Sequence, residues 1–114
     1  MTDANATYDL QTASQEERLH PRYECRLEAF VMFRGAPWRC WIRDLSLGGA
    51  GLEPALPAML GQDVELNCPS FGFEDALAGR VVNIAERRTC VAFDLDPERL
   101  DALARFMAAN VMVD

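Results

Sequence analysis

Several features that this sequence lacks narrow what the protein can be. It has a single histidine, His20, and its four cysteines form no CxxC pair, so no clustered zinc ligands with the usual spacing are present. No run of about 18 apolar residues occurs, which predicts that the chain does not insert into a membrane. The net charge of −7 argues against a nucleic-acid polymer as partner, because binding along a phosphate backbone needs a broad basic face.

Catalytic patterns are also missing. The sequence shows no nucleophile–base pair, no cluster of metal ligands and no phosphate-cradling loop. We therefore expect a protein that is not an enzyme and that carries neither a metal nor a cofactor. The cysteines, Cys25, Cys40, Cys68 and Cys90, are scattered through apolar runs, which predicts buried, reduced thiols and a cytoplasmic location.

The chain is long enough for one domain. Residues 1–15 are polar, without lysine, arginine or an apolar stretch, so they do not resemble a secretory signal. We expect residues 1–16 to be a disordered lead-in, residues 17–110 to form the domain, and residues 111–114 to be a short tail.

Alternating apolar residues predict a chain of short strands. Strands are expected from Tyr23 to Arg34 and over 38–45, 50–53, 63–68, 74–84 and 89–95. Trp38 and Trp41 are expected on opposite faces of the second strand, one of them in the core. Asp96 and Pro97 predict the start of a terminal helix with an apolar stripe at Leu100, Leu103, Phe106 and Met107. Six strands and one helix predict a small antiparallel barrel with the helix packed across it, with an OB-like barrel as the alternative.

Two polar motifs flank the first predicted hairpin. Arg18 and Arg22 lie in a segment that Pro21 keeps out of a helix, and residues 44–49 read Asp-Leu-Ser-Leu-Gly-Gly. The hairpin would bring the two motifs together at one end of a sheet. Guanidinium groups bind phosphate as forks, and an Asp–Ser–Gly turn can read a polar ring edge. Together they predict a receptor for a phosphorylated nucleobase compound.

The order and spacing of these motifs resemble the PilZ domain, a bacterial receptor for cyclic di-GMP with RxxxR and (D/N)xSxxG signatures. The resemblance extends from Glu17 to about Asn110 and implies an all-β fold, a six-stranded antiparallel barrel with a C-terminal helix. It implies that Arg18 and Arg22 bind phosphate and guanine, and that Asp44 and Ser46 bond guanine edges. Gly49 would allow close approach of the backbone. Arg22–Arg26 is a second possible register for the first signature, although Arg26 falls inside the first strand. Possible secondary contacts are His20, Arg26, Gly48 and Asn83.

Two departures from the family pattern bear on the site. Glu17 stands where an extra arginine is associated with a stacked ligand dimer, which predicts one ligand per site or a weaker affinity. Asn83 replaces an aromatic residue, which removes a stacking platform but leaves a group that can bond a base edge.

The resemblance implies an effector that binds cyclic di-GMP, changes the conformation of its N-terminal segment, and regulates a downstream protein in motility, biofilm or exopolysaccharide control. The alternative is a PilZ-like adaptor that binds proteins without nucleotide.

Overall fold

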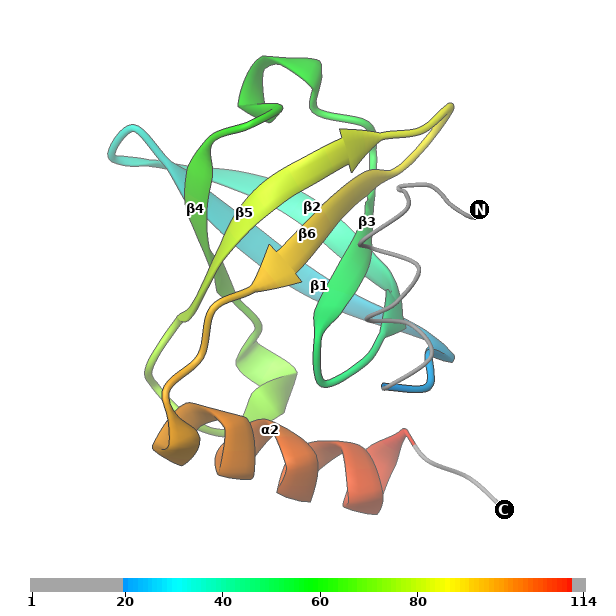
Figure 1. Cartoon of the computed structure of the whole chain (residues 1–114), viewed down its shortest axis with the longest axis vertical. Coiled ribbons are helices and arrows are strands. Elements are labelled where there is room, and N and C mark those ends of the chain that lie inside the picture. The colour runs from blue at the N-terminus through cyan, green and yellow to red at the C-terminus, as the bar shows by residue number, and fades with distance from the viewer. Residues whose placement is uncertain (1–19, 112–114) are drawn as a thin grey trace.

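Six antiparallel strands close into a barrel in this computed structural model, which describes residues 20–111 (Figure 1). The strands are β1 (Tyr23–Phe33), β2 (Ala36–Leu45), β3 (Gly49–Glu53), β4 (Asp63–Asn67), β5 (Leu77–Ile84) and β6 (Thr89–Phe93). They follow one another around the barrel in the order β1-β2-β3-β6-β5-β4, and β4 pairs with β1 to complete the circle. The predicted barrel with one C-terminal helix is confirmed.

Apolar side chains at alternate positions along the strands fill the barrel. In β1, Ala29, Val31 and Phe33 are buried, whereas the residues between them lie on the outer face. Arg34 and Gly35 join β1 to β2 with φ values of 52° and 79°, the backbone that a two-residue hairpin turn needs. The apolar interior supplies most of the stability, because burying apolar side chains is the main favourable term in folding.

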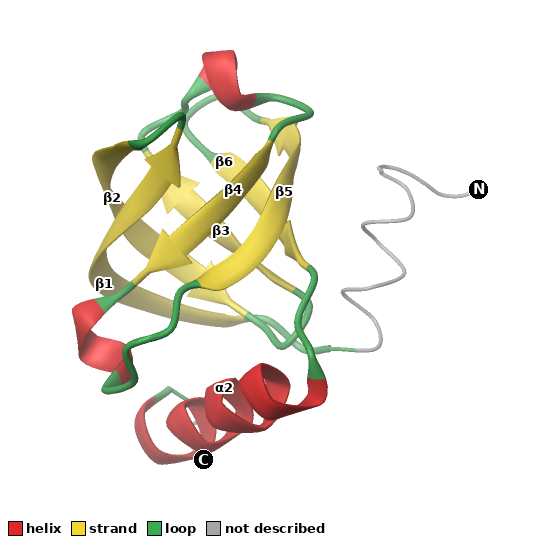
Figure 2. Ribbon diagram, turned by 90° about the vertical axis from the view of Figure 1, so that its left-hand side faces the viewer, coloured by secondary structure: helices red, strands yellow, loops and turns green. Residues whose placement is uncertain are grey.

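Two short 3₁₀ turns close the ends of the barrel where loops were expected (Figure 2). They are η1 (Pro57–Met59) and η2 (Pro69–Phe71), and each begins with a proline, whose fixed φ suits a first helical position. Met59 and Phe71 are buried and extend the core at these turns. β5 begins at Leu77, three residues later than the predicted start at Glu74, because residues 74–76 belong to the irregular connection between η2 and β5.

The prediction that one tryptophan enters the core is wrong. Trp38 shares the inward phase of Cys40 and Ile42 but lies near the β1–β2 turn, where 45% of it is exposed. Trp41 lies on the outer face, with the guanidinium carbon of Arg26 4.9 Å from its ring centroid. The smaller side chains of Cys40 and Ile42 take the core positions of β2.

The terminal helix α2 (Pro97–Asn110) lies across one end of the barrel (Figures 1 and 2). Asp96 caps it by accepting a 2.8 Å hydrogen bond from the Arg99 amide, as predicted. Leu103, Phe106 and Met107 are buried, but Leu100, expected in the same apolar stripe, is 38% exposed. No helix within residues 20–111 has the length and apolar character that a membrane crossing requires.

Candidate functional site

A β-bulge at Arg43 decides where Asp44 points. Ile42 pairs with Leu52 and Asp44 pairs with the adjacent Gly51, so Arg43 is an extra residue in β2. Strict alternation would place Asp44 on the inner face with Cys40 and Ile42, but after the bulge the inward position passes to Leu45, which is fully buried. Bulges re-aim side chains in this way. The carboxylate of Asp44 therefore lies on the outer side of the barrel wall.

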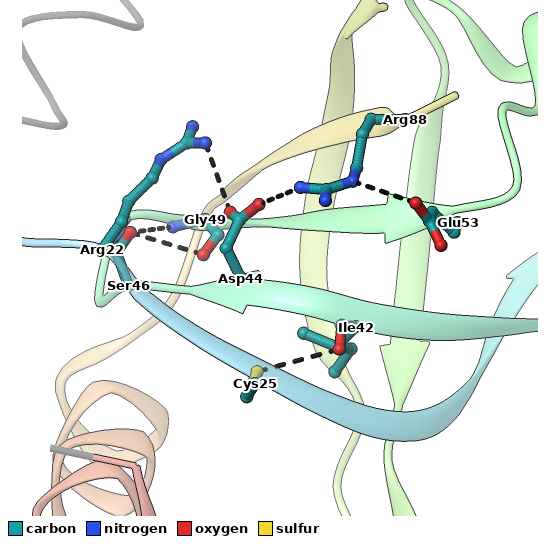
Figure 3. Close-up of polar contacts among 9 residues, drawn as sticks. Arg22, Cys25, Ile42, Asp44, Ser46, Gly49, Glu53 and Arg88 are labelled. Atoms are coloured by element: carbon teal, nitrogen blue, oxygen red, sulfur yellow. Dashed lines mark hydrogen bonds and ion pairs between the residues drawn. The ribbon is translucent and has the colours of Figure 1, made fainter. Parts of the chain in front are cut away.

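Two arginines from distant parts of the chain bind the Asp44 carboxylate (Figure 3). Arg22, just before β1, places Nη1 3.2 Å from Asp44 Oδ1, and Arg88, just before β6, places Nη1 2.7 Å from Asp44 Oδ2. Only 11% of the Asp44 side chain is exposed, against 37% for each arginine side chain. The carboxylate is thus nearly buried and neutralised on both of its oxygens.

The ion pairs continue along the barrel wall. Arg88 Nε lies 3.5 Å from Glu53 Oε2, and Arg43 Nη1 lies 2.9 Å from Glu53 Oε1. We refer to Arg22, Asp44, Arg88, Glu53 and Arg43, in this order, as the ion-pair chain. Partial desolvation alone would raise the pKa of Glu53, but hydrogen bonds and ion pairs with Arg43 and Arg88 outweigh it and lower that pKa. Three cations and two anions leave the ion-pair chain with an excess of positive charge.

The turn after β2 is held by the Ser46 hydroxyl. Its oxygen accepts hydrogen bonds of 3.1 Å from the amides of both Gly48 and Gly49, and it donates at 3.3 Å to the Gly49 carbonyl. A serine hydroxyl has one donor and two acceptor positions, so these bonds use its capacity. A Cβ at Gly49 would collide with the Val91 carbonyl of β6, so the close approach at Gly49 is between strands.

A cavity of about 370 Å³ opens beside Asp44. Its walls are formed by Arg22, Glu24, Cys25, Arg43, Asp44 and Arg88. Burial, followed by the nearby Asp44 charge, raises the pKa of the Cys25 thiol to about 11, so this cysteine stays protonated at neutral pH. The Nε–H of Arg43 is buried and has no acceptor within residues 20–111. The unpaired Arg43 Nε–H donor and the three guanidinium groups in the cavity wall favour an anionic ligand.

The other predicted site residues lie elsewhere or outside the described part of the chain. Arg18 and Glu17 precede residue 20, and so does the whole of the expected lead-in, residues 1–16. Asn83 is exposed and lies on β5, three strands away from Asp44: it pairs with Cys90 of β6, which pairs with Gly51 of β3, which pairs with Asp44. Three strand spacings correspond to roughly 14 Å. Neither Asn83 nor the half-buried His20 lines the cavity. The guanidinium of Arg26 packs on the Trp41 ring, on the outer face of β1 and β2. This contact favours the Arg18–Arg22 register, in which Arg22 is the second arginine of the motif.

Sequence reasoning missed Arg88, Arg43 and Glu53. The signal for Arg88 is indirect: it precedes β6, and β6 reaches Asp44 only because β3 lies between them and pairs with both β2 and β6. Arg43 adjoins Asp44 in the sequence, but only the bulge gives both residues access to the same cavity. Within residues 20–111 no three histidine, cysteine or acidic side chains are grouped so that they could hold a metal ion.

Comparison with known protein families assigns this chain to one of them. A sequence model of the PilZ domain matches residues 16–109, which is most of the chain. The protein belongs to the PilZ domain family. The motif residues Arg22, Asp44, Ser46 and Gly49 thus lie within the family's domain.

Solved structures similar to this PilZ domain share its fold. The PilZ domain of CeSA from a cellulose-synthesising bacterium is 19% identical, with a TM-score of 0.66 over 77% of this chain and 95% of that one. Borreliella burgdorferi PlzA, solved in complex with c-di-GMP, is 26% identical, with a TM-score of 0.57 over 84% of this chain. MrkH, a c-di-GMP-dependent transcription regulatory factor, is 15% identical, with a TM-score of 0.61 over 79% of this chain. This chain spans 43% of PlzA and 49% of MrkH, and no curated protein matches it.

Proposed function

We propose that this PilZ domain is a cyclic di-GMP receptor with no catalytic activity of its own. The observation that carries the proposal is the meeting of Arg22 and Asp44, one from each signature motif, in a single cavity of about 370 Å³. That volume lies within the range of small-molecule sites. The family membership and the complex of PlzA with c-di-GMP support the same ligand.

The chemistry of the cavity suits both parts of this ligand. Guanidinium groups bind phosphate oxygens through paired, charge-assisted hydrogen bonds, and Arg22 presents such a group at the cavity wall. The Asp44 carboxylate can accept hydrogen bonds from the adjacent N–H donors of a guanine edge. Ser46 acts indirectly in this proposal, because its hydroxyl already holds the turn that positions Gly48 and Gly49.

We further propose that binding is transmitted to a downstream protein in the cytoplasm through the N-terminal segment. Arg18 and Arg22 are four residues apart, so ligand phosphates that bridge them would fix the path of the chain leading into β1. The partner would then recognise a changed surface. Motility, biofilm and exopolysaccharide control are the outputs that the family resemblance implies.

Calorimetric titration with cyclic di-GMP tests the receptor role. We expect saturable binding with one ligand per site, because Glu17 disfavours a second pair of phosphates, and a higher melting temperature with ligand. GMP is the matched control ligand, since it carries one guanine and one phosphate. No heat and no thermal shift at tens of micromolar ligand would refute the receptor role and favour the nucleotide-independent adaptor.

Limited trypsin digestion tests the role of the N-terminal segment. All eleven basic residues are arginines, so trypsin can cut only after arginine, and Arg18–Leu19 is one such bond. We expect cyclic di-GMP to slow cleavage there, while cleavage after Arg105 on the exposed side of α2 serves as the internal control. Equal cleavage at Arg18 with and without saturating ligand would contradict the conformational change.

A further inference from the structure

We propose that Asp44 exchanges one counter-ion when ligand binds: Arg22 leaves the carboxylate for a ligand phosphate, and Arg88 stays and holds it. This inference rests on the proposed cyclic di-GMP site and adds Arg88 to it as a positioning residue. Asp44 lies between Arg22 and Arg88 in the ion-pair chain, with one arginine on each oxygen (Figure 3). The two arginines differ in ways that assign them different parts.

The first difference is the length of the contact. Arg88 Nη1 lies 2.7 Å from Asp44 Oδ2, which is typical of a strong charge-assisted hydrogen bond. Arg22 Nη1 lies 3.2 Å from Asp44 Oδ1, at the long end of the range for N–H···O hydrogen bonds. The Arg22 contact is therefore the weaker one and the one that a phosphate can replace more easily.

The second difference is the part of the fold to which each arginine belongs. Arg88 also reaches Glu53, which Arg43 fixes from the other side. The next residue, Thr89, is fully buried; its hydroxyl accepts from the Leu56 amide at 2.8 Å and donates to the Pro54 carbonyl at 3.2 Å. These bonds tie the start of β6 to the loop after β3. Arg22 lies outside the barrel strands, one residue before β1 begins, on the segment that leads to Arg18.

The exchange keeps the Asp44 carboxylate neutralised while Arg22 binds the ligand. Asp44 is only 8% exposed, and a buried carboxylate that loses its partner is strongly destabilising. With Arg88 in place, Arg22 can turn to the ligand while Asp44 remains neutralised and aimed at the guanine edge. Without Arg88, Asp44 would retain Arg22 alone and would compete with the phosphate for it. Arg88 thus raises ligand affinity through Asp44.

The test compares Arg88→Gln with Arg87→Gln, a matched loss of charge in the same turn. Arg87 is exposed and makes no ion pair within residues 20–111. Cyclic di-GMP affinity is measured by calorimetry for both variants, for the wild type, and for Arg88→Lys as the conservative rescue. In the free proteins, the Nε–Hε NMR resonance of Arg22 reports its contact with Asp44. It is assigned from its loss in Arg22→Lys. Melting curves show whether each variant is folded.

We expect Arg88→Gln to weaken binding by about tenfold or more, Arg88→Lys to recover part of the loss, and Arg87→Gln to bind within about twofold of the wild type. The Arg22 resonance should shift in ligand-free Arg88→Gln and not in Arg87→Gln. A folded Arg88→Gln variant that binds like Arg87→Gln would overturn the proposal. If Arg88→Gln does not fold, the Arg88→Lys variant decides. A folded Arg88→Lys with wild-type affinity and an unshifted Arg22 resonance would then overturn the proposal.

Weaker binding with an unshifted Arg22 resonance would also overturn the exchange, because Arg88 would then act on the ligand directly. If the wild type itself fails to bind cyclic di-GMP, the proposed function fails, which is a different result from the failure of the exchange.

Discussion

Gly51 of β3 faces the Asp44 carboxylate across the β2–β3 pair so closely that a Cβ at Gly51 would overlap the carboxylate. The space that Asp44 occupies beside Arg22 and Arg88 therefore depends on the absence of a side chain at position 51. Gly51 is not part of the DxSxxG signature, and its role follows from strand register. It is a structural requirement for the ion-pair chain.

Gly51→Ala should displace Asp44 and disturb both of its ion pairs. We expect a loss of about 1–3 kcal/mol in the free energy of unfolding, as is usual for overpacking, and a weaker affinity for cyclic di-GMP. Urea denaturation and calorimetry measure the two effects. In an Asp44→Ala background the colliding atoms are gone, so the same substitution should cost much less stability. An equal cost in both backgrounds would show that the strain lies elsewhere.

The two registers of the arginine motif can be separated by single substitutions. Arg22→Ala and Arg18→Ala should each cost about 1.5–3 kcal/mol of binding free energy, because each removes charge-assisted bonds. Arg26→Ala should leave binding nearly unchanged and cost about 0.5–1 kcal/mol of stability through its lost contact with Trp41. If Arg26→Ala abolished binding while Arg18→Ala did not, the Arg22–Arg26 register would be the correct one.

Glu53 links the ion-pair chain to pH. Its pKa in the folded protein lies below the ordinary value of 4.5, because the effects of Arg43 and Arg88 outweigh desolvation. The stability that ionised Glu53 contributes to the folded protein is therefore present above about pH 4.5 and is lost as pH falls through the lower, folded-state pKa. Glu53→Gln should flatten this part of the curve of unfolding free energy against pH. Glu86→Gln, which removes an exposed carboxylate in the β5–β6 turn, is the control.

The cap of α2 can be tested independently of any ligand. Asp96→Ala removes the hydrogen bond to the Arg99 amide and should lower the free energy of unfolding by about 1 kcal/mol. Asp101→Ala removes only the exposed pair with Arg105, at 2.8 Å, and should cost about 0.3–0.5 kcal/mol. Thermal denaturation followed by circular dichroism compares them. A larger loss for Asp101 would mean that the cap contributes little.

Most of the fold could be predicted because it depends on local patterns. The alternation from Tyr23 to Arg34 predicted the first hairpin, whose turn the structure places at Arg34–Gly35, and Asp96-Pro97 predicted the start of the helix. Trp38 shows the limit of this reasoning. Alternation gives the face on which a side chain lies, but whether that face is covered at a given point depends on neighbouring strands that are distant in the sequence.

The sequence by itself determined the strands, the helix and the two motifs, because alternation, turn residues and caps act between near neighbours. The hairpin between the motifs was enough to predict that Arg22 would lie near Asp44. Only the tertiary structure decided that Asp44 faces outward, since this depends on the bulge at Arg43. Barrel closure alone brings β6, and with it Arg88, beside β3. The register of β2 and β3 makes Gly51 leave room for the carboxylate. The site at Asp44 depends on contacts between strands that no local pattern encodes.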